Sequence, residues 1–263
     1  MADLFAFGSG AGNLDADSRY GNAGDLKKTQ YVMQLLGFPG DADTLKALVI
    51  AGEKGIEVES GILDVTRGAN NSEDYHEISP MGIMPALKEA HYKVAGDLAI
   101  ISFIEGRGLG NRMTPRNAEV LAHQNYWIDI ARDNVAPYVQ TIMAQRVLNA
   151  MSDPGTEEDS VAVEAAKMAL VVPLDALDAQ LATKEYIVGE YSYADVHWTS
   201  YIHLLCVAGE QNLVQQRANM SQWWERIKSR KSFSGQNLVA YDLLPSLDDI
   251  KAKRMQDVVI DDF

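Results

Sequence analysis

Apolar and polar positions along the chain separate a mixed N-terminal part from a helical remainder. Over the first ~110 residues, short apolar runs alternate with stretches of helical spacing, and the later residues have helical spacing almost throughout. The mixed part predicts the element order β-α-β-β-β-α. We expect a first strand at residues 4–7, a helix from Thr44 to Gly55, strands at 56–65, 84–87 and 92–94, and a helix at 98–104.

The connection between the first predicted strand and the first predicted helix is unusual. It has about thirty residues, whereas a βα connection usually has only a few. We therefore interpret residues 14–43 as an insertion, and within it KKTQYVMQLLG (residues 27–37) predicts a short extra helix. A segment of this length is usually a lid, a binding loop or disordered, and it could also be a decoration without a function. Tyr20 and Arg19 lie on this segment and would reach a cleft if it folds over one.

Residues 109–115 (LGNRMTP) predict a linker between two domains. The expected organisation is a domain at 1–108, an all-helical domain at 115–240 and a tail at 241–263. In the second domain, residues 119–148 predict one long helix or two, ended by SDPG at 152–155. Four leucines recur at helical spacing and predict a buried stripe: Leu170, Leu174, Leu177 and Leu181.

Composition narrows the class of protein. The 263 residues include 37 acidic and 23 basic side chains, a formal net charge of −14, and 47% are hydrophobic. These values are typical of a soluble globular protein, and the acidic balance argues against a nucleic-acid partner. No uncharged apolar run approaches the ~20 residues of a membrane span, and the first residues do not resemble a secretory signal. We expect a cytoplasmic protein without a membrane segment.

Cysteine and histidine usage limits the chemistry. One cysteine, Cys206, excludes an intramolecular disulfide, and its apolar context predicts a core residue. The five histidines lack the spacing of metal ligands, so we predict no metal.

Three motifs make the chain recognisable. They are ISPMGIMPAL (78–87), YIVGEYSYADV (186–196) and WWERIKSRKSF (223–233). In this order and spacing they resemble motifs of the cytosolic glutathione transferase superfamily, and FGSGAGNL (7–14) resembles a segment of its bacterial β-aryl etherase members. The resemblance implies a thioredoxin-like N-terminal domain, an all-α C-terminal domain, glutathione as co-substrate and a homodimer.

Two of these motifs also have a physical interpretation. X–Pro bonds adopt the cis form at little cost, so Met84-Pro85 is a candidate cis peptide. The resemblance implies that this turn presents the backbone of Met84 to the cysteinyl part of glutathione. Ser192 and Asp195 have the spacing of a capping box, which is a structural role.

The implied reaction needs a thiolate, which a helix N-terminus and a nearby hydroxyl or amide donor can stabilise. The donor should lie between the first strand and the first helix. Two alignments compete: FGSGAGNL places Asn13 there, and TLKAL (44–48) places Thr44 there. Ser9 is a third candidate. The structural alternatives are a helix N-cap for Thr44 and a turn residue for Asn13.

The resemblance places the γ-glutamyl group of glutathione at Asp97 and Leu98, where the family usually has Glu-Ser. Asp97 can pair with an ammonium group. Leu98 offers no hydroxyl, but its backbone N–H at a helix N-terminus can bind a carboxylate. The lost hydrogen bond predicts a binding free energy weaker by ~1.5–3 kcal/mol.

The fold also implies a co-substrate pocket beside the first helix of the second domain. We expect it to include Tyr20, His123, Tyr126 and Trp127, although Trp127 also fits a helical core position. The hypothesis is a glutathione-dependent transferase or lyase, in which the thiolate attacks a small aromatic or apolar electrophile such as an ether, halide or epoxide. The alternative is a non-catalytic binding or structural protein with this fold.

Overall fold

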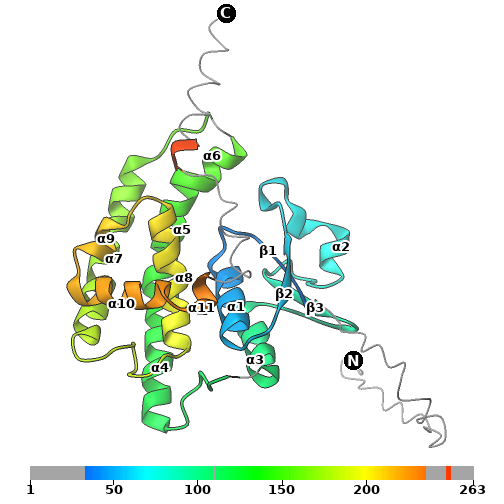
Figure 1. Ribbon diagram of the computed structural model, residues 1–263. Helices are drawn as coiled ribbons and strands as arrows, with labels where there is room; N and C mark the ends of the chain where they lie inside the picture. Colours follow the sequence, from blue (N-terminus) through cyan, green and yellow to red (C-terminus); the bar gives the residue numbers. More distant parts are fainter. Residues whose placement is uncertain (1–32, 109, 154, 235–246, 250–263) are drawn as a thin grey trace, which may run out of the picture. The chain divides into compact units, whose positions relative to one another are not determined.

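A four-stranded mixed sheet forms the N-terminal half of the described chain (Figure 1). The computed structural model describes residues 33–108, 110–153, 155–234 and 247–249. In the sheet, β1 (Met33–Gly37) is parallel to β2 (Val58–Ile62) and antiparallel to β3 (Ala86–Glu89), which pairs with β4 (Tyr92–Ala95). The strand order is β2-β1-β3-β4, so β1 and β3 are the central strands.

Two helices pack with this sheet. The crossover from β1 to its parallel partner β2 is α1 (Ala42–Glu53), and α3 (Asp97–Arg107) follows β4. Between β2 and β3 lie three short helical segments: η2 (Val65–Arg67), η3 (Ala69–Asn71) and α2 (Glu73–His76). Helix α1 packs against α3 and also against α8 (Tyr193–Val207) of the helical half. Its side chains are buried on nearly all sides, because the helix lies between α3 of the N-terminal half and α8 of the helical half.

The C-terminal half is built of helices. Its first part is one continuous helical run from residue 118 to residue 152, which agrees with the first of the two alternatives predicted for residues 119–148. The elements are α4 (Ala118–Ile130), η4 (Ala131–Val135), α5 (Ala136–Met143), η5 (Ala144–Leu148), α6 (Asn149–Ser152), α7 (Ser160–Leu181), α8, α9 (Asn212–Gln215), α10 (Ala218–Lys228) and α11 (Lys231–Ser234).

The continuous run contains two π-helical turns, η4 and η5. Pro137 follows η4 closely, and because proline has no N–H it cannot make the ordinary helical hydrogen bond. A π turn inserts an extra residue per turn and rotates the side chains that follow. Arg132 lies within the first of these turns.

The predicted core stripe and capping box are confirmed. The four leucines of α7 are at most 4% exposed. The Asp195 side chain accepts hydrogen bonds from the backbone N–H groups of Ile187 and Ser192, and the Ser192 hydroxyl caps the first turn of α8. Near the end of the helical half, Arg230 pairs with Glu53 of α1 through two hydrogen bonds of 2.6 and 2.7 Å. This pair holds the last motif against the N-terminal half.

The thioredoxin-like and helical architecture is as predicted, but the position of the first strand was wrong. The β-α-β unit begins with β1 at Met33–Gly37, inside the segment interpreted as an insertion. Residues 33–37 were expected to be part of a helix and instead form a central strand. The connection to α1 is therefore residues 38–41, and no long insertion separates this strand from α1. The strand predicted at 4–7 lies outside the described residues.

Candidate active site

A cavity of about 910 Å³ lies where α1 and the start of α3 meet α4, α5 and α8. Its size is within the range of small-molecule sites, which is ~300–1,000 Å³. The N-terminal half contributes Asp43 and Lys46 from α1, and one face of α3 that begins with Asp97 and Leu98 and continues to Glu105. The cavity therefore opens beside the N-terminal turns of two helices.

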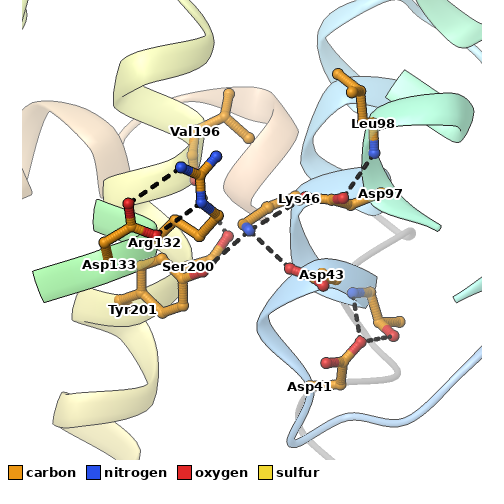
Figure 2. A network of polar contacts seen from close by, with 11 residues as sticks. Asp41, Asp43, Lys46, Asp97, Leu98, Arg132, Asp133, Val196, Ser200 and Tyr201 are labelled. Atoms are coloured by element: carbon orange, nitrogen blue, oxygen red, sulfur yellow. Dashed lines mark hydrogen bonds and ion pairs between the residues drawn. The ribbon is translucent and has the colours of Figure 1, made fainter. Parts of the chain in front are cut away.

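Lys46 is the centre of the polar network on this side of the cavity (Figure 2). Its ammonium donates to Asp43 Oδ1 at 2.6 Å and to Asp97 Oδ2 at 3.3 Å. The third contact is with the Tyr201 hydroxyl of α8 at 3.1 Å. One buried side chain thus joins α1, α3 and α8.

The charge of Lys46 is stabilised by this network. Burial by itself lowers the pKa of a lysine, but the Tyr201 hydroxyl and the two carboxylates outweigh burial and raise the pKa of Lys46. Lys46 is therefore a fixed cation. Two carboxylates face one ammonium, which leaves one excess negative charge around Lys46.

The N-terminus of α1 is capped by Asp41, not by Thr44. Asp41 accepts the Thr44 backbone N–H at 2.8 Å and the Thr44 hydroxyl at 2.7 Å. Desolvation and the neighbouring Asp43 raise the pKa of Asp41 to about 6. The Thr44 hydroxyl also accepts the Phe38 N–H at 3.3 Å. Its single proton is thus directed at Asp41.

Thr44 faces the sheet and does not line the cavity. It is 5% exposed, and a Cβ at Gly37 of β1 would clash with its side chain. The void beside it has a volume of about 10 Å³. This space is too small for a tripeptide.

The turn before β3 contains a cis peptide at Met84–Pro85, as predicted. The hydroxyls of Tyr75 and Ser79 both donate to the carbonyl of Ile83, at 2.8 and 2.9 Å, and so fix the approach to this turn. The Pro85 carbonyl accepts the N–H of Gly96, the residue before Asp97. The turn is therefore held next to the start of α3.

The start of α3 differs from the expectation for Leu98. Its backbone N–H donates to Asp97 Oδ1 at 2.7 Å, so in this structure that N–H is engaged by the chain itself. The Leu98 side chain is 74% exposed. Asp97 therefore bonds both Leu98 and Lys46 through its carboxylate.

One face of α4 lines the cavity, and it is not the face expected. The lining residues of this face are Leu121, Gln124, Asn125, Ile128 and Asp129, followed by Arg132 of η4. His123 and Tyr126 are exposed on another face. Trp127 is a core residue, 5% exposed, and its carbonyl accepts the indole N–H of Trp198. Because the lining positions recur every three to four residues, the three aromatic candidates point elsewhere.

His197 of α8 lies on the same wall. It is 9% exposed, and burial together with Lys46 keeps its pKa well below the usual histidine range. Asp97 acts in the opposite direction but does not reverse the shift. The imidazole is therefore neutral at physiological pH.

Comparisons with known proteins agree with this architecture. Residues 31–106 match the family model "Glutathione S-transferase, N-terminal domain". Glutathione S-transferase F10 of Arabidopsis thaliana is 27% identical over 198 residues, which cover 73% of this chain and 90% of the relative. The crystal structure of glutathione transferase F7 from Populus trichocarpa has a TM-score of 0.71 at 25% identity, covering 80% of this chain and 99% of that one.

Together these comparisons support the glutathione transferase superfamily as the family of this chain. The chain is a glutathione transferase-like enzyme. The β-etherase LigF from a Sphingobium species has the same fold, with a TM-score of 0.67 at 20% identity over 77% of this chain and 97% of that one. The start of the family match at residue 31 agrees with β1 as the first strand of the domain.

The three candidates for the group that donates a hydrogen bond to the thiolate differ in where they lie relative to α1. Thr44 does lie in the first turn of α1, as its alignment predicted. Ser9, Asn13 and Tyr20 lie outside the described residues. Since the strand-to-helix connection is residues 38–41, the argument that placed Ser9 and Asn13 within it was wrong.

Sequence reasoning missed most of the residues that line the cavity, among them Asp43, Lys46, Gln124, Arg132, His197 and Tyr201. A signal existed for some of them. Gln124, Asn125, Asp129 and Arg132 recur at helical spacing and form a polar face on a helix whose other face holds Trp127. Lys46 had no such signal, because its partners are up to 155 residues away in the chain.

Other chemistry is limited in the described part of the chain. Cys206 is half-buried against the helical core, and burial raises the pKa of its thiol to about 11, so it is protonated at neutral pH. Within the described ranges, no group of three or more His, Cys, Asp or Glu side chains is arranged to hold a metal ion. No helix of this part is long and apolar enough to span a membrane.

Proposed function

We propose that this enzyme joins the sulfur of glutathione to a small electrophile. The observation that carries the proposal is the cavity at the N-terminal turns of α1 and α3, in a chain whose residues 31–106 match the glutathione transferase N-terminal domain. In the proposed reaction, the thiolate of glutathione attacks an electrophilic carbon. The new C–S bond forms while the bond to an ether oxygen, a halide or an epoxide oxygen breaks.

Glutathione binding is proposed at the start of α3 and the turn before β3. The excess negative charge around Lys46 suits the ammonium of the γ-glutamyl group, which would bind Asp97. The cysteinyl part would pair with the backbone of Met84 beside Pro85. The hydrogen bond between Gly96 and Pro85 keeps these two subsites at a fixed separation.

The thiolate is proposed to lie at the N-terminus of α1, where the helix dipole favours an anion. Thr44 remains the donor candidate among the described residues, but its hydroxyl must leave Asp41 before it can donate to sulfur. Ser9 and Asn13 are the other candidates. Three single alanine variants with glutathione thiol ionisation as the readout would separate them, because the true donor lowers the thiol pKa.

Glutathione binding tests the proposal directly. Ligand at about 100 times its dissociation constant should add ~2.7 kcal/mol to the free energy of unfolding, which raises the melting temperature. Turnover with an aromatic halide and with an epoxide then tests the chemistry. No thermal shift at millimolar concentration would contradict the proposal, whereas a shift without turnover would favour the non-catalytic alternative.

We also propose that the enzyme is a homodimer and is located in the cytoplasm. The exposed side chains of Met81, Ile83 and Leu98, at 82, 51 and 74%, lie on the turn before β3 and at the start of α3 and would be covered by a second subunit. Sedimentation equilibrium tests the dimer. A monomer at all accessible concentrations would contradict it.

A further inference from the structure

Tyr201 of α8 meets Lys46 of α1 at the cavity. The Tyr201 hydroxyl is 3.1 Å from the Lys46 ammonium, which also contacts Asp43 and Asp97 (Figure 2). These four residues come from three helices, and all four line the cavity. Because their polar ends converge on the ammonium, the Tyr201 hydroxyl lies at the cavity wall where the two halves meet.

The hydrogen bond between Lys46 and Tyr201 has a fixed direction. An ammonium group has three protons and no lone pair, so Lys46 donates and the Tyr201 oxygen accepts. Within the part of the chain that the structure describes, no other hydrogen bond of this hydroxyl is found. The phenolic proton of Tyr201 is therefore left for a group that enters the cavity.

The electrostatic surroundings suit Tyr201 as an acid. Burial raises the pKa of Tyr201 above its ordinary value, although the Lys46 ammonium acts in the opposite direction. The hydroxyl is therefore protonated at neutral pH. Once the proton has been given up, the Lys46 ammonium faces a phenolate and stabilises its negative charge.

Other proton-bearing groups of the cavity wall are directed at carboxylates. Two of the three contacts of the Lys46 ammonium are with aspartates, and Arg132 pairs with two neighbouring aspartates. Burial and the nearby Glu105 carboxylate raise the pKa of Tyr193, whose oxygen is covered by protein atoms. Tyr201 differs from these groups, because its neighbour is a cation that cannot accept its proton.

The position of the Tyr201 hydroxyl also fits the proposed reaction. Lys46 contacts Asp43 in the first turn of α1, so this hydroxyl is two hydrogen bonds away from the turn at which the thiolate is proposed to lie. Sulfur attacks a carbon from the side opposite to the leaving atom. An electrophile held between this turn and α8 would present its carbon to the sulfur and its leaving atom to Tyr201.

We infer that Tyr201 is a catalytic residue that gives its proton to a leaving oxygen, so that the electrophiles of this enzyme are epoxides or ethers rather than halides. The inference rests on the proposed function and narrows it. As the C–S bond forms, the electron pair of the breaking C–O bond goes to oxygen, which takes the proton of Tyr201. The Lys46 ammonium stabilises the tyrosinate, and solvent returns the proton that the thiol released when it ionised. A halide leaves as an anion without a proton and gains nothing from Tyr201.

Turnover with a matched pair of electrophiles tests the inference. Styrene oxide and benzyl chloride are both attacked at a carbon beside a phenyl ring, but oxygen leaves from one and chloride from the other. In Tyr201→Phe, kcat/KM with styrene oxide should fall by about a hundredfold or more, which is the contribution of a general acid, and with benzyl chloride by less than about threefold. Tyr193→Phe is the matched control, since it removes the hydroxyl of another cavity tyrosine on the same helix and should leave the ratio of the two values unchanged.

The outcomes separate the inference from the function on which it rests. A similar fall with both electrophiles would mean that Tyr201 supports the site as a whole, and no fall with styrene oxide would remove Tyr201 from the reaction. Either result overturns the inference and leaves the proposed function standing. If the unchanged protein joins glutathione to neither electrophile, the proposed function fails and the inference fails with it.

Heavy water provides a second measurement that needs no variant. Proton transfer from Tyr201 is slower in D2O, so kcat/KM with styrene oxide should fall relative to that with benzyl chloride. An isotope effect on the thiol of glutathione is common to both electrophiles and cancels in this ratio. A ratio that is the same in both solvents would overturn the inference, even if the phenylalanine variant does not fold.

Discussion

Helices α1 and α8 begin with similar chemistry but in very different surroundings. Each has an aspartate in its N-terminal cap: Asp41 precedes α1 and accepts the Thr44 N–H of the first turn, whereas Asp195 lies in the first turn of α8 and accepts the N–H of Ser192, the residue before the helix. Burial is the first cause that raises the pKa of each to about 6. Asp195 is fully buried in the helical core and also accepts the indole N–H of Trp223 at 3.0 Å. The next turn of α1 instead faces the cavity through Asp43 and Lys46.

The difference shows what separates a structural cap from a site. Around Asp195, the partners are protein groups on three elements or loops of the same half, and little room remains for a ligand. Around Lys46, the partners come from both halves and line an open cavity. Local capping chemistry is therefore shared, whereas access to a ligand depends on the packing of the two halves.

The largest effect on stability is expected when the buried Asp195 carboxylate at the N-terminus of α8 is removed. Asp195→Ala leaves the Ile187 N–H, the Ser192 N–H and the Trp223 indole without their acceptor in the core. We expect a loss of about 3 kcal/mol or more in the free energy of unfolding, measured with urea. Glutathione affinity per folded molecule should not change. A loss under about 1 kcal/mol would contradict the structural role of this residue.

The second-largest effect is expected on glutathione affinity, when Asp97 in the cavity beside Lys46 is changed. Asp97→Asn removes the charge proposed to bind the γ-glutamyl ammonium. The dissociation constant of glutathione should rise by about tenfold to a hundredfold, which corresponds to the ~1.5–3 kcal/mol of a charged hydrogen bond. Calorimetry measures it, with the exposed Asp74→Asn as the matched control. Unchanged affinity would remove Asp97 from the proposed binding site.

The third effect is a pH dependence of the cavity wall. The pKa of His197 is lower in the folded protein than the ordinary value of 6.5, so its contribution to stability is present above that value and is lost as pH falls below it. Asp41 and Asp195 act oppositely, since their raised pKa values favour the folded state as pH falls below about 6.

The pH dependence of stability that is due to His197 can be separated from that of the two carboxyl groups by comparing the unchanged protein with the His197→Phe variant. The difference in free energy of unfolding between the unchanged protein and the variant should fall by up to about 1.4 kcal/mol per pH unit below the ordinary histidine pKa. Urea titrations at several pH values measure it. A constant difference would mean that His197 is protonated as readily in the folded protein as in the unfolded chain.

The smallest effect concerns Thr44. Thr44→Val keeps the shape of the side chain but removes its hydrogen bonds with Asp41 and Phe38. We expect a loss of about 1–2 kcal/mol in stability, with kcat changed by less than about threefold, because the hydroxyl serves the cap. Thr44→Ser is the control that retains the bonds. A folded Val variant whose turnover falls by about a hundredfold or more would instead make Thr44 the thiolate donor.

Much of the fold could be predicted from local pattern. The cis Met84–Pro85 turn, the Ser192–Asp195 capping box and the leucine stripe of α7 each depend on residues close in the chain, and all three are confirmed. Residues 33–37 could not be assigned from pattern alone. A short apolar run fits a helix and a buried strand equally, and pairing with β2 and β3 decided for the strand.

By itself, the sequence determined the two-part architecture and the acidic, helix-rich character of the chain, since periodicity and capping signals act over a few residues. Only the tertiary structure decided which polar residues form the site. Lys46 meets Asp97 and Tyr201 because α1 packs between the sheet and α8, and Gln124 and His197 share a wall because α4 lies beside α8. These contacts join residues tens to more than a hundred positions apart, and no local pattern encodes such distances.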